Sequence, residues 1–146
     1  MPEFLDLHSK TTKSLRAAAE AAMRRHGLHL GQDHLLRVLW ERDGRTPGEI
    51  AAATNVTTPA VTKAAGRMIE LGLIVRRDDD RDNRLVRLWL TDAGRALQAP
   101  VEAERRHLEQ RVTARLTQTE RRHLLSALAK IDAAAREALH ATEAAE

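Results

Sequence analysis

The sequence contains no cysteine, which excludes disulfide bonds, thiolate nucleophiles, sulfur-ligated zinc and any thiol-based peroxide sensor. Aromatic residues make up only 2% of the chain and tyrosine is absent, so the core has to be built from aliphatic side chains, which favours helices. Long apolar runs are missing too, and the first ten residues, MPEFLDLHSK, carry acids where a signal peptide needs a positive flank. We therefore expect a cytoplasmic protein without a membrane span.

Motifs of catalysis are also missing. The chain has no glycine-rich phosphate loop, no HExxH and no GxSxG, and its only serines are Ser9, Ser14 and Ser126. We therefore expect no enzyme, no catalytic residues, no metal and no cofactor.

Length and charge limit the domain organisation and the kind of nucleic-acid surface that the protein can have. A chain of 146 residues is long enough for one domain with a dimerisation appendage, and we treat it as a single unit. The net charge is only +3, from 24 Lys and Arg against 21 Asp and Glu, so any nucleic-acid surface must be a local one.

The apolar spacing is helical at both ends of the chain and changes to strand spacing only in the middle. It predicts helices over about residues 5–26, 31–43, 47–55 and 59–71, a hairpin of strands 73–77 and 85–90, and helices that begin near residues 92 and 118. Pro100 is expected to kink the first of these last two helices. Thr46 and Thr117 each begin a capping box, with Glu49 and Glu120 as the reciprocal partners.

The predicted fold class is mainly α with a small β-hairpin wing. Its core is a winged helix-turn-helix at residues 31–95, flanked by terminal helices at residues 1–28 and 96–146. Ile50, Ala51 and Ala53 are expected to face inward on the third helix, and Val61, Ala64, Ala65 and Met68 on the fourth. The terminal helices have apolar stripes without an evident partner, so we expect a second copy of the chain to cover them.

The fourth predicted helix has the chemistry of a DNA recognition helix. With Val61 at the buried centre, steps of about 100° place Pro59, Lys63, Gly66, Arg67 and Glu70 on the exposed side, flanked by Ala60 and Thr62. A slim first turn admits the helix to the major groove, where Lys63 and Arg67 are candidates for guanine or phosphate contacts. Thr57, Thr58 and Thr62 can donate to phosphate, although Thr58 is better explained as a helix cap. Gly66 weakens a helix interior and indicates a close approach by something that the sequence does not identify.

Residues 46–95 resemble the DNA-binding lobe of the MarR family of bacterial transcriptional regulators. The motifs that carry the resemblance are G-L-I-V-R-R at residues 72–77, Asp82-Asn83-Arg84, and L-T-x-x-G at residues 90–94. Weaker similarity in the second and last helices extends it over most of the chain, so we expect one MarR-like domain over residues 1–146.

The resemblance implies a homodimeric repressor that binds a pseudo-palindromic operator in double-stranded DNA and is released by a small, often anionic or phenolic effector. It also implies that Arg84 reaches the minor groove and that Asp82 holds it, while Asn83 replaces a frequent arginine. The acids that precede them fit a turn that prevents edge pairing better than a metal site. The full set of candidate DNA-binding residues is Thr57, Thr58, Pro59, Ala60, Thr62, Lys63, Arg67, Arg77, Arg81 and Arg84, with Asp82 as wing support.

Three alternatives remain open. The pairs Glu104/His107 and Glu120/His123 have the spacing of ligands in di-iron helical bundles. The cluster of His26, His29, His34 and Asp33 lies where some members of the family sense zinc. An architectural DNA binder without sequence preference is the third alternative.

Overall fold

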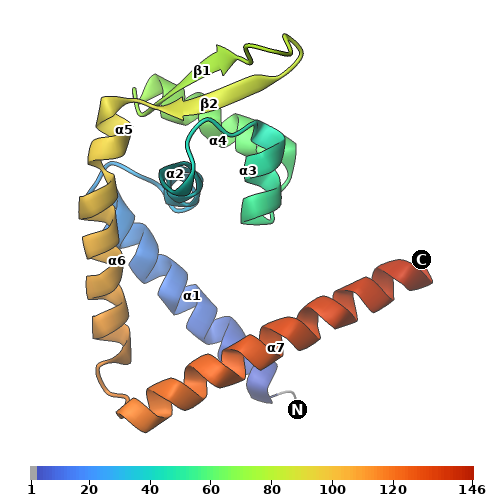
Figure 1. Cartoon of the computed structure of the whole chain (residues 1–146). Coiled ribbons are helices and arrows are strands. Elements are labelled where there is room, and N and C mark those ends of the chain that lie inside the picture. The colour runs from blue at the N-terminus through green and yellow to red at the C-terminus, as the bar shows by residue number, and fades with distance from the viewer. Residues whose placement is uncertain (1–2) are drawn as a thin grey trace. The chain divides into compact units, whose positions relative to one another are not determined.

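The computed structural model describes residues 3–146 and contains the helices and the hairpin in the expected order (Figure 1). The elements are α1 (Glu3–Arg24), α2 (Gln32–Glu41), α3 (Pro47–Thr54), α4 (Thr58–Glu70), β1 (Ile74–Asp78), β2 (Val86–Leu90), α5 (Asp92–Ala96), α6 (Gln98–Thr113) and α7 (Gln118–Ala145). This arrangement confirms the predicted fold class, mainly helical with a two-stranded wing. Within residues 3–146, no helix is both long enough and apolar enough to cross a membrane.

Contacts between residues divide the chain into two compact units, Met1–Leu108 and Glu109–Glu146. The first unit contains the hydrophobic core, the helix-turn-helix pair α3–α4 and the hairpin. The second contains the end of α6 and all of α7. The predicted capping box at the start of α7 is confirmed, because Thr117 Oγ1 accepts from Glu120 N at 3.1 Å and Glu120 Oε1 accepts from Thr117 N at 3.1 Å.

The core of the first unit is aliphatic, as the scarcity of aromatic residues predicts. Leu36 on α2, Ile50 on α3 and Met68 on α4 are fully buried. On α4 the predicted stripe is confirmed, since Val61, Ala65 and Met68 are buried and Ala64 is half-buried. The prediction for Ala53 on α3 is wrong, because it lies about 200° around the helix from the buried Ala51 and is exposed.

Threonine caps start both helices of the helix-turn-helix. Thr46 Oγ1 accepts from Glu49 N at 3.2 Å, as predicted, but Glu49 does not close the box, because its carboxylate pairs with Arg42 instead. At α4 the cap is Thr57, whose Oγ1 accepts from Ala60 N at 3.3 Å, and Thr58 is the first helical residue. The interpretation of Thr58 as the cap is therefore wrong by one position.

The stretch after the hairpin is two helices rather than one kinked helix. Helix α5 ends at Ala96, Leu97 separates the two, and α6 begins at Gln98. Pro100 is therefore the third residue of α6, where a backbone amide has no partner within the helix, so the proline costs no hydrogen bond there. The break precedes Pro100, and the predicted kink at that residue is wrong.

The register of the hairpin decides which of its side chains face α4. Ile74 pairs with Leu90, Arg76 with Leu88, and Arg77 with Arg87. Residues directly opposite one another share a face of a sheet, and successive residues alternate between its faces. Since Ile74, Leu88 and Leu90 are buried, Arg76 belongs to the face turned toward the core and α4, whereas Arg77 belongs to the opposite face.

Candidate nucleic-acid interface

The candidate interface consists of the exposed side of α4 and the tip of the hairpin. All the residues predicted to bind DNA are exposed in the structure. Those from Thr57 to Arg67 lie on α4 and its N-cap, and Arg77, Arg81 and Arg84 lie on the hairpin. The structure thus keeps them accessible on two neighbouring elements.

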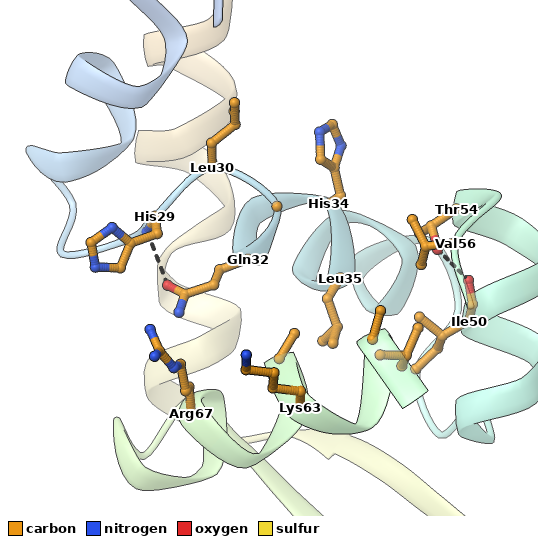
Figure 2. Close-up of a pocket in the computed structure, with 14 residues that line it drawn as sticks. His29, Leu30, Gln32, His34, Leu35, Ile50, Thr54, Val56, Lys63 and Arg67 are labelled. Atoms are coloured by element: carbon orange, nitrogen blue, oxygen red, sulfur yellow. Dashed lines mark hydrogen bonds between the residues drawn. The ribbon is translucent and has the colours of Figure 1, made fainter. Parts of the chain in front are cut away.

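One side of α4 borders a cavity of about 390 Å³ beneath α2 and the loop that precedes it. Figure 2 shows Lys63 and Arg67 rising from α4 toward this cavity, with His29 and Gln32 across from them. Neither cation forms a hydrogen bond or an ion pair within the described part of the chain. Both charges are therefore available to an anion.

The start of α4 carries small side chains, and two threonines there, Thr57 and Thr62, already form hydrogen bonds with the helix backbone. Thr57 caps the helix, and Thr62 donates its hydroxyl to Thr58 O at 3.1 Å. Pro59 and Ala60 add little bulk, so the backbone of this turn can come close to a ligand. The Thr58 hydroxyl, which is not needed as a cap, is available to donate to phosphate.

At the hairpin tip, Asp82 holds Arg84 in a bidentate pair. Arg84 Nε lies 3.0 Å from Asp82 Oδ1 and Arg84 Nη2 lies 3.2 Å from Oδ2, while the Arg84 backbone N–H donates to Oδ1 at 3.0 Å. The Arg84 guanidinium, followed by its backbone N–H, holds the pKa of Asp82 below its usual value. The Arg84 side chain is nevertheless 90% exposed, so its orientation is restricted while its outer face stays open.

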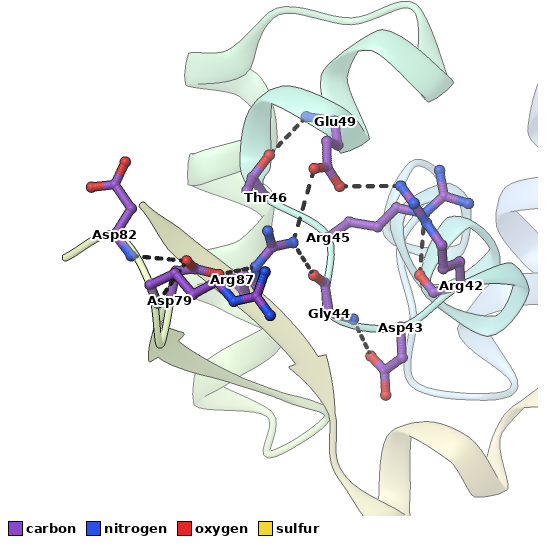
Figure 3. A network of polar contacts seen from close by, with 10 residues as sticks. Arg42, Asp43, Gly44, Arg45, Thr46, Glu49, Asp79, Asp82 and Arg87 are labelled. Atoms are coloured by element: carbon purple, nitrogen blue, oxygen red, sulfur yellow. Dashed lines mark hydrogen bonds and ion pairs between the residues drawn. The ribbon is translucent and has the colours of Figure 1, made fainter. Parts of the chain in front are cut away.

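Sequence reasoning missed the residues that brace this wing, Asp79 and Arg87 (Figure 3). Asp79 Oδ1 accepts from Arg87 Nε at 2.6 Å, and Asp79 Oδ2 accepts from the backbone N–H groups of Arg81 at 3.1 Å and Asp82 at 3.0 Å. The Arg87 pairing lowers the pKa of Asp79, and Asp79 in turn raises the pKa of Arg87. An Asp that reaches amides two and three residues ahead is a turn signal, and it supports the interpretation of these acids as a turn.

Arg87 also fastens the hairpin to the loop between α2 and α3. Its Nη1 donates to Gly44 O at 2.9 Å and lies 3.9 Å from Glu49 Oε1. Leu88 N donates to Arg45 O at 2.9 Å, which adds a β-bridge beside β2. The wing is therefore held to the helix-turn-helix by polar contacts far apart in sequence (Figure 3).

Two of the histidines near the first two helices each lie near one carboxylate, whereas His34 Nδ1 lies 3.4 Å from Arg37 Nη1. His29 Nδ1 lies 3.1 Å from Glu20 Oε1, and His26 Nε2 lies 3.6 Å from Glu104 Oε2. The N–H of Leu30 and then the His29 ring lower the pKa of Glu20. Asp33 is buried and accepts from Gly31 N at 3.0 Å. Over residues 3–146, no group of three or more His, Asp or Glu side chains is placed to hold a metal ion.

The acids of the two Glu–His pairs also have structural partners. Glu104 Oε1 accepts from Arg25 Nη1 at 2.8 Å, which ties the end of α1 to α6, and Glu120 closes the capping box of α7. These contacts give both glutamates a structural role that does not require a metal ion.

Comparisons with known proteins agree with this geometry. Residues 26–85 match the model of the MarR family. The chain is 32% identical over 117 residues to an HTH-type transcriptional repressor of Mycobacterium tuberculosis, covering 80% of this chain and 84% of that protein. It is 30% identical over 119 residues to the homoprotocatechuate degradative operon repressor of Escherichia coli, covering 74% of this chain and 80% of that protein.

Among solved structures, the fold is similar to that of Staphylococcus aureus MepR in its complex with DNA, with a TM-score of 0.82 and 23% identity. The alignment covers 90% of this chain and 97% of that chain, and it supports the fold. With the identity to the mycobacterial repressor over most of both chains, the conclusion is that this chain belongs to the MarR family of winged helix-turn-helix transcriptional regulators.

Proposed function

We propose that the chain represses transcription as a homodimer on a pseudo-palindromic operator, with α4 in the major groove and the hairpin tip in the minor groove. Family membership makes it a DNA-binding transcriptional regulator and not an enzyme. The observation that carries the finer proposal is that Lys63 and Arg67 on α4 have no partner within residues 3–146, while Asp82 holds the exposed Arg84 at the tip of the hairpin. The relatives in M. tuberculosis and E. coli that are named repressors support repression rather than activation. We also propose that the protein acts in the cytoplasm.

The proposed contacts divide by chemistry. Lys63 and Arg67 reach base edges or phosphates from the exposed side of α4, and Arg84 enters the minor groove, where a narrow groove attracts arginine. The remaining proposed contacts are small or polar residues at the start of α4 and arginines on the hairpin: Thr57, Thr58, Pro59, Ala60, Thr62, Arg77 and Arg81.

The proposed homodimer rests on apolar side chains that the single chain leaves in water. On α1, Phe4, Leu5 and Leu7 are at least half exposed, and on α7 Leu125 and Leu139 are 54% and 58% exposed. Full burial of an exposed side chain of this size contributes about 1.5–3 kcal/mol and burial of a half-exposed one about half as much, so a second copy that covers them stabilises the pair. The division into a DNA-binding lobe at residues 31–95 and dimerisation helices at residues 1–28 and 96–146 stays a prediction on the same grounds.

Replacing Arg84 by alanine is expected to weaken operator binding by about 1–3 kcal/mol for each half-site, because one minor-groove contact per half-site is lost. Arg84 is exposed and pairs only locally with Asp82, so the thermal unfolding midpoint should stay close to that of the wild type. A gel-shift titration measures the affinity. Unchanged affinity in this variant would remove the wing from the mechanism.

We also propose that a small anion acts as effector in the 390 Å³ cavity beside α4. The cavity has the size of a site for a small organic molecule, its walls are largely aliphatic, and Lys63 and Arg67 stand at its edge (Figure 2). A carboxylate bound there engages the same cations that DNA needs, so it favours the DNA-free state by its differential affinity.

Benzoate is a suitable probe of this effector site, with benzyl alcohol as its uncharged control. Millimolar benzoate is expected to raise the unfolding midpoint of the free protein and to lower its affinity for operator DNA, whereas benzyl alcohol should do less of both. Equal effects of the two compounds on DNA affinity would contradict competition for Lys63 and Arg67.

Selecting bound sequences from a random pool of duplex DNA tests the proposed function as a whole. A homodimer should enrich an inverted repeat whose half-sites are one helical turn apart, about 34–36 Å. It should favour this repeat over random DNA by at least about a thousandfold. A pool without enrichment would instead support the architectural DNA binder. Sedimentation equilibrium on the same preparation should give twice the mass of the chain.

A further inference from the structure

A small recess separates α4 from the hairpin, on the side of the helix away from the large cavity. Thr62, Gly66 and Ile69 line it from α4, and Arg76 and Val86 line it from the hairpin. Its volume is about 80 Å³, far below the roughly 300 Å³ at which sites for organic ligands begin. The recess is therefore too small for an effector.

Gly66 lines this recess from α4, and nothing in the described chain requires glycine at that position. It lies in the middle of α4, is exposed, and is absent from the residues with positive φ, so its backbone conformation does not require glycine. A Cβ atom added there meets nothing within 4 Å, so packing does not require glycine either. Since glycine is the poorest helix former after proline, the open space beside Gly66 calls for an explanation outside the folded chain.

Arg76 lines the opposite side of the recess, and its positive charge has no partner in the described chain. It is exposed, and within residues 3–146 it forms no hydrogen bond or ion pair. The strand register places it on the face of the hairpin turned toward α4, whereas Arg77 lies on the other face. A positive charge without a partner in the described chain thus faces a helix position that has no side chain.

We infer that the recess receives one phosphodiester strand of the operator, with Arg76 paired to a phosphate and Gly66 giving the strand room to approach α4. This inference rests on the proposed function. In duplex DNA a single sugar–phosphate strand separates a major groove from the adjacent minor groove. A protein with α4 in the first groove and Arg84 in the second has to straddle that strand, and the surface between them is this recess. A backbone contact of this kind positions the protein on the duplex without reading sequence.

Four variants of the full chain, titrated on the selected operator at several salt concentrations, test the inference. Gly66→Leu should bind at least about tenfold more weakly because its side chain fills the recess, while its unfolding midpoint should not fall, since leucine is a good helix former. Ala53→Leu adds bulk at an exposed position on α3 and should bind like the wild type. Arg76→Ala should reduce the slope of log affinity against log salt by about one per subunit. Arg77→Ala, on the other face of the hairpin, should also lose affinity because Arg77 is a proposed DNA contact, and it serves as the comparison for Arg76→Ala in the combined variants.

The decisive comparison combines these changes. If the side chain added by Gly66→Leu keeps the strand out of the recess, Arg76→Ala has little further effect in that background, whereas Arg77→Ala lowers affinity by the same factor in both backgrounds. Full additivity of Gly66→Leu and Arg76→Ala, wild-type affinity in Gly66→Leu, or an unchanged salt slope in Arg76→Ala overturns the inference. In each of those cases the proposed function stands if Lys63 and Arg67 variants still lose affinity. Failure of the wild type to bind any duplex overturns both.

Discussion

Replacing Lys63 and Arg67 together by alanine is expected to lower the affinity of the dimer for its operator by about a thousandfold. Each such contact contributes about 1–3 kcal/mol, so the lower limit for two residues in each of two half-sites is about 4 kcal/mol. Neither cation has a partner within residues 3–146, so the loss should leave the fold intact. Fluorescence anisotropy with labelled operator, at several salt concentrations, measures the effect and shows whether phosphate contacts were removed.

The matched control removes the same charge from a distant element. Lys10 and Lys13 are exposed on α1, and Lys10→Ala/Lys13→Ala changes the net charge by the same amount. This control should lose only a small fraction of the affinity. A loss equal to that of the α4 variant would mean that overall charge governs binding, which contradicts the assignment of α4 as the recognition helix.

Replacing Gly94 by alanine is expected to destabilise the protein by about 3 kcal/mol, the upper end for an overpacked core site. A Cβ on Gly94 would overlap the backbone oxygen of Leu73 and come within 3.2 Å of Leu90 Cδ2. The Leu73 oxygen cannot move freely, because it accepts from Thr91 N at 3.0 Å. The Gly94 oxygen accepts from Trp40 Nε1 at 2.9 Å, so a shift of Gly94 also disturbs α2. Urea denaturation measures the free energy of unfolding.

Gly66→Ala is the control for this prediction, because it makes the same chemical change where the added Cβ has nothing within 4 Å. It should stabilise the protein by up to about 1 kcal/mol through helix propensity. If Gly94→Ala were as stable as the wild type, the close approach of α5 to the strand start at Leu73 would not contribute to the fold as described.

Local chemistry made much of this fold predictable. The caps at Thr46 and Thr117, the end of α3 near Asn55 and the change of apolar period after Gly72 depend on neighbouring residues, so the sequence shows them directly. The exposed side of α4 followed from a single assumption, that Val61 is buried, and the structure confirms that assumption.

The parts of the site that sequence reasoning missed depend on contacts between distant segments. Arg87 reaches Gly44, 43 residues earlier, and no local pattern relates the two. The predicted set contains Arg77 and not Arg76, and the sequence does not decide between the two, because the consecutive apolar residues before them leave the alternation ambiguous. Only the register of Arg76 opposite the buried Leu88 shows which arginine faces α4.

Footprinting of the full chain on the selected operator tests the proposed DNA-binding mode, with dimethyl sulfate probing guanine N7 in the major grooves and hydroxyl radicals probing the sugars that line the minor grooves. A homodimer with α4 in the major groove and Arg84 in the minor groove should give a twofold-symmetric footprint, in which two major grooves about 10–10.5 base pairs apart are protected, each beside a protected minor groove. In Arg84→Ala the protection of the minor grooves should be lost while that of the major grooves remains. A footprint without twofold symmetry, or minor-groove protection that persists without Arg84, would contradict the proposed binding of a homodimer through α4 and Arg84.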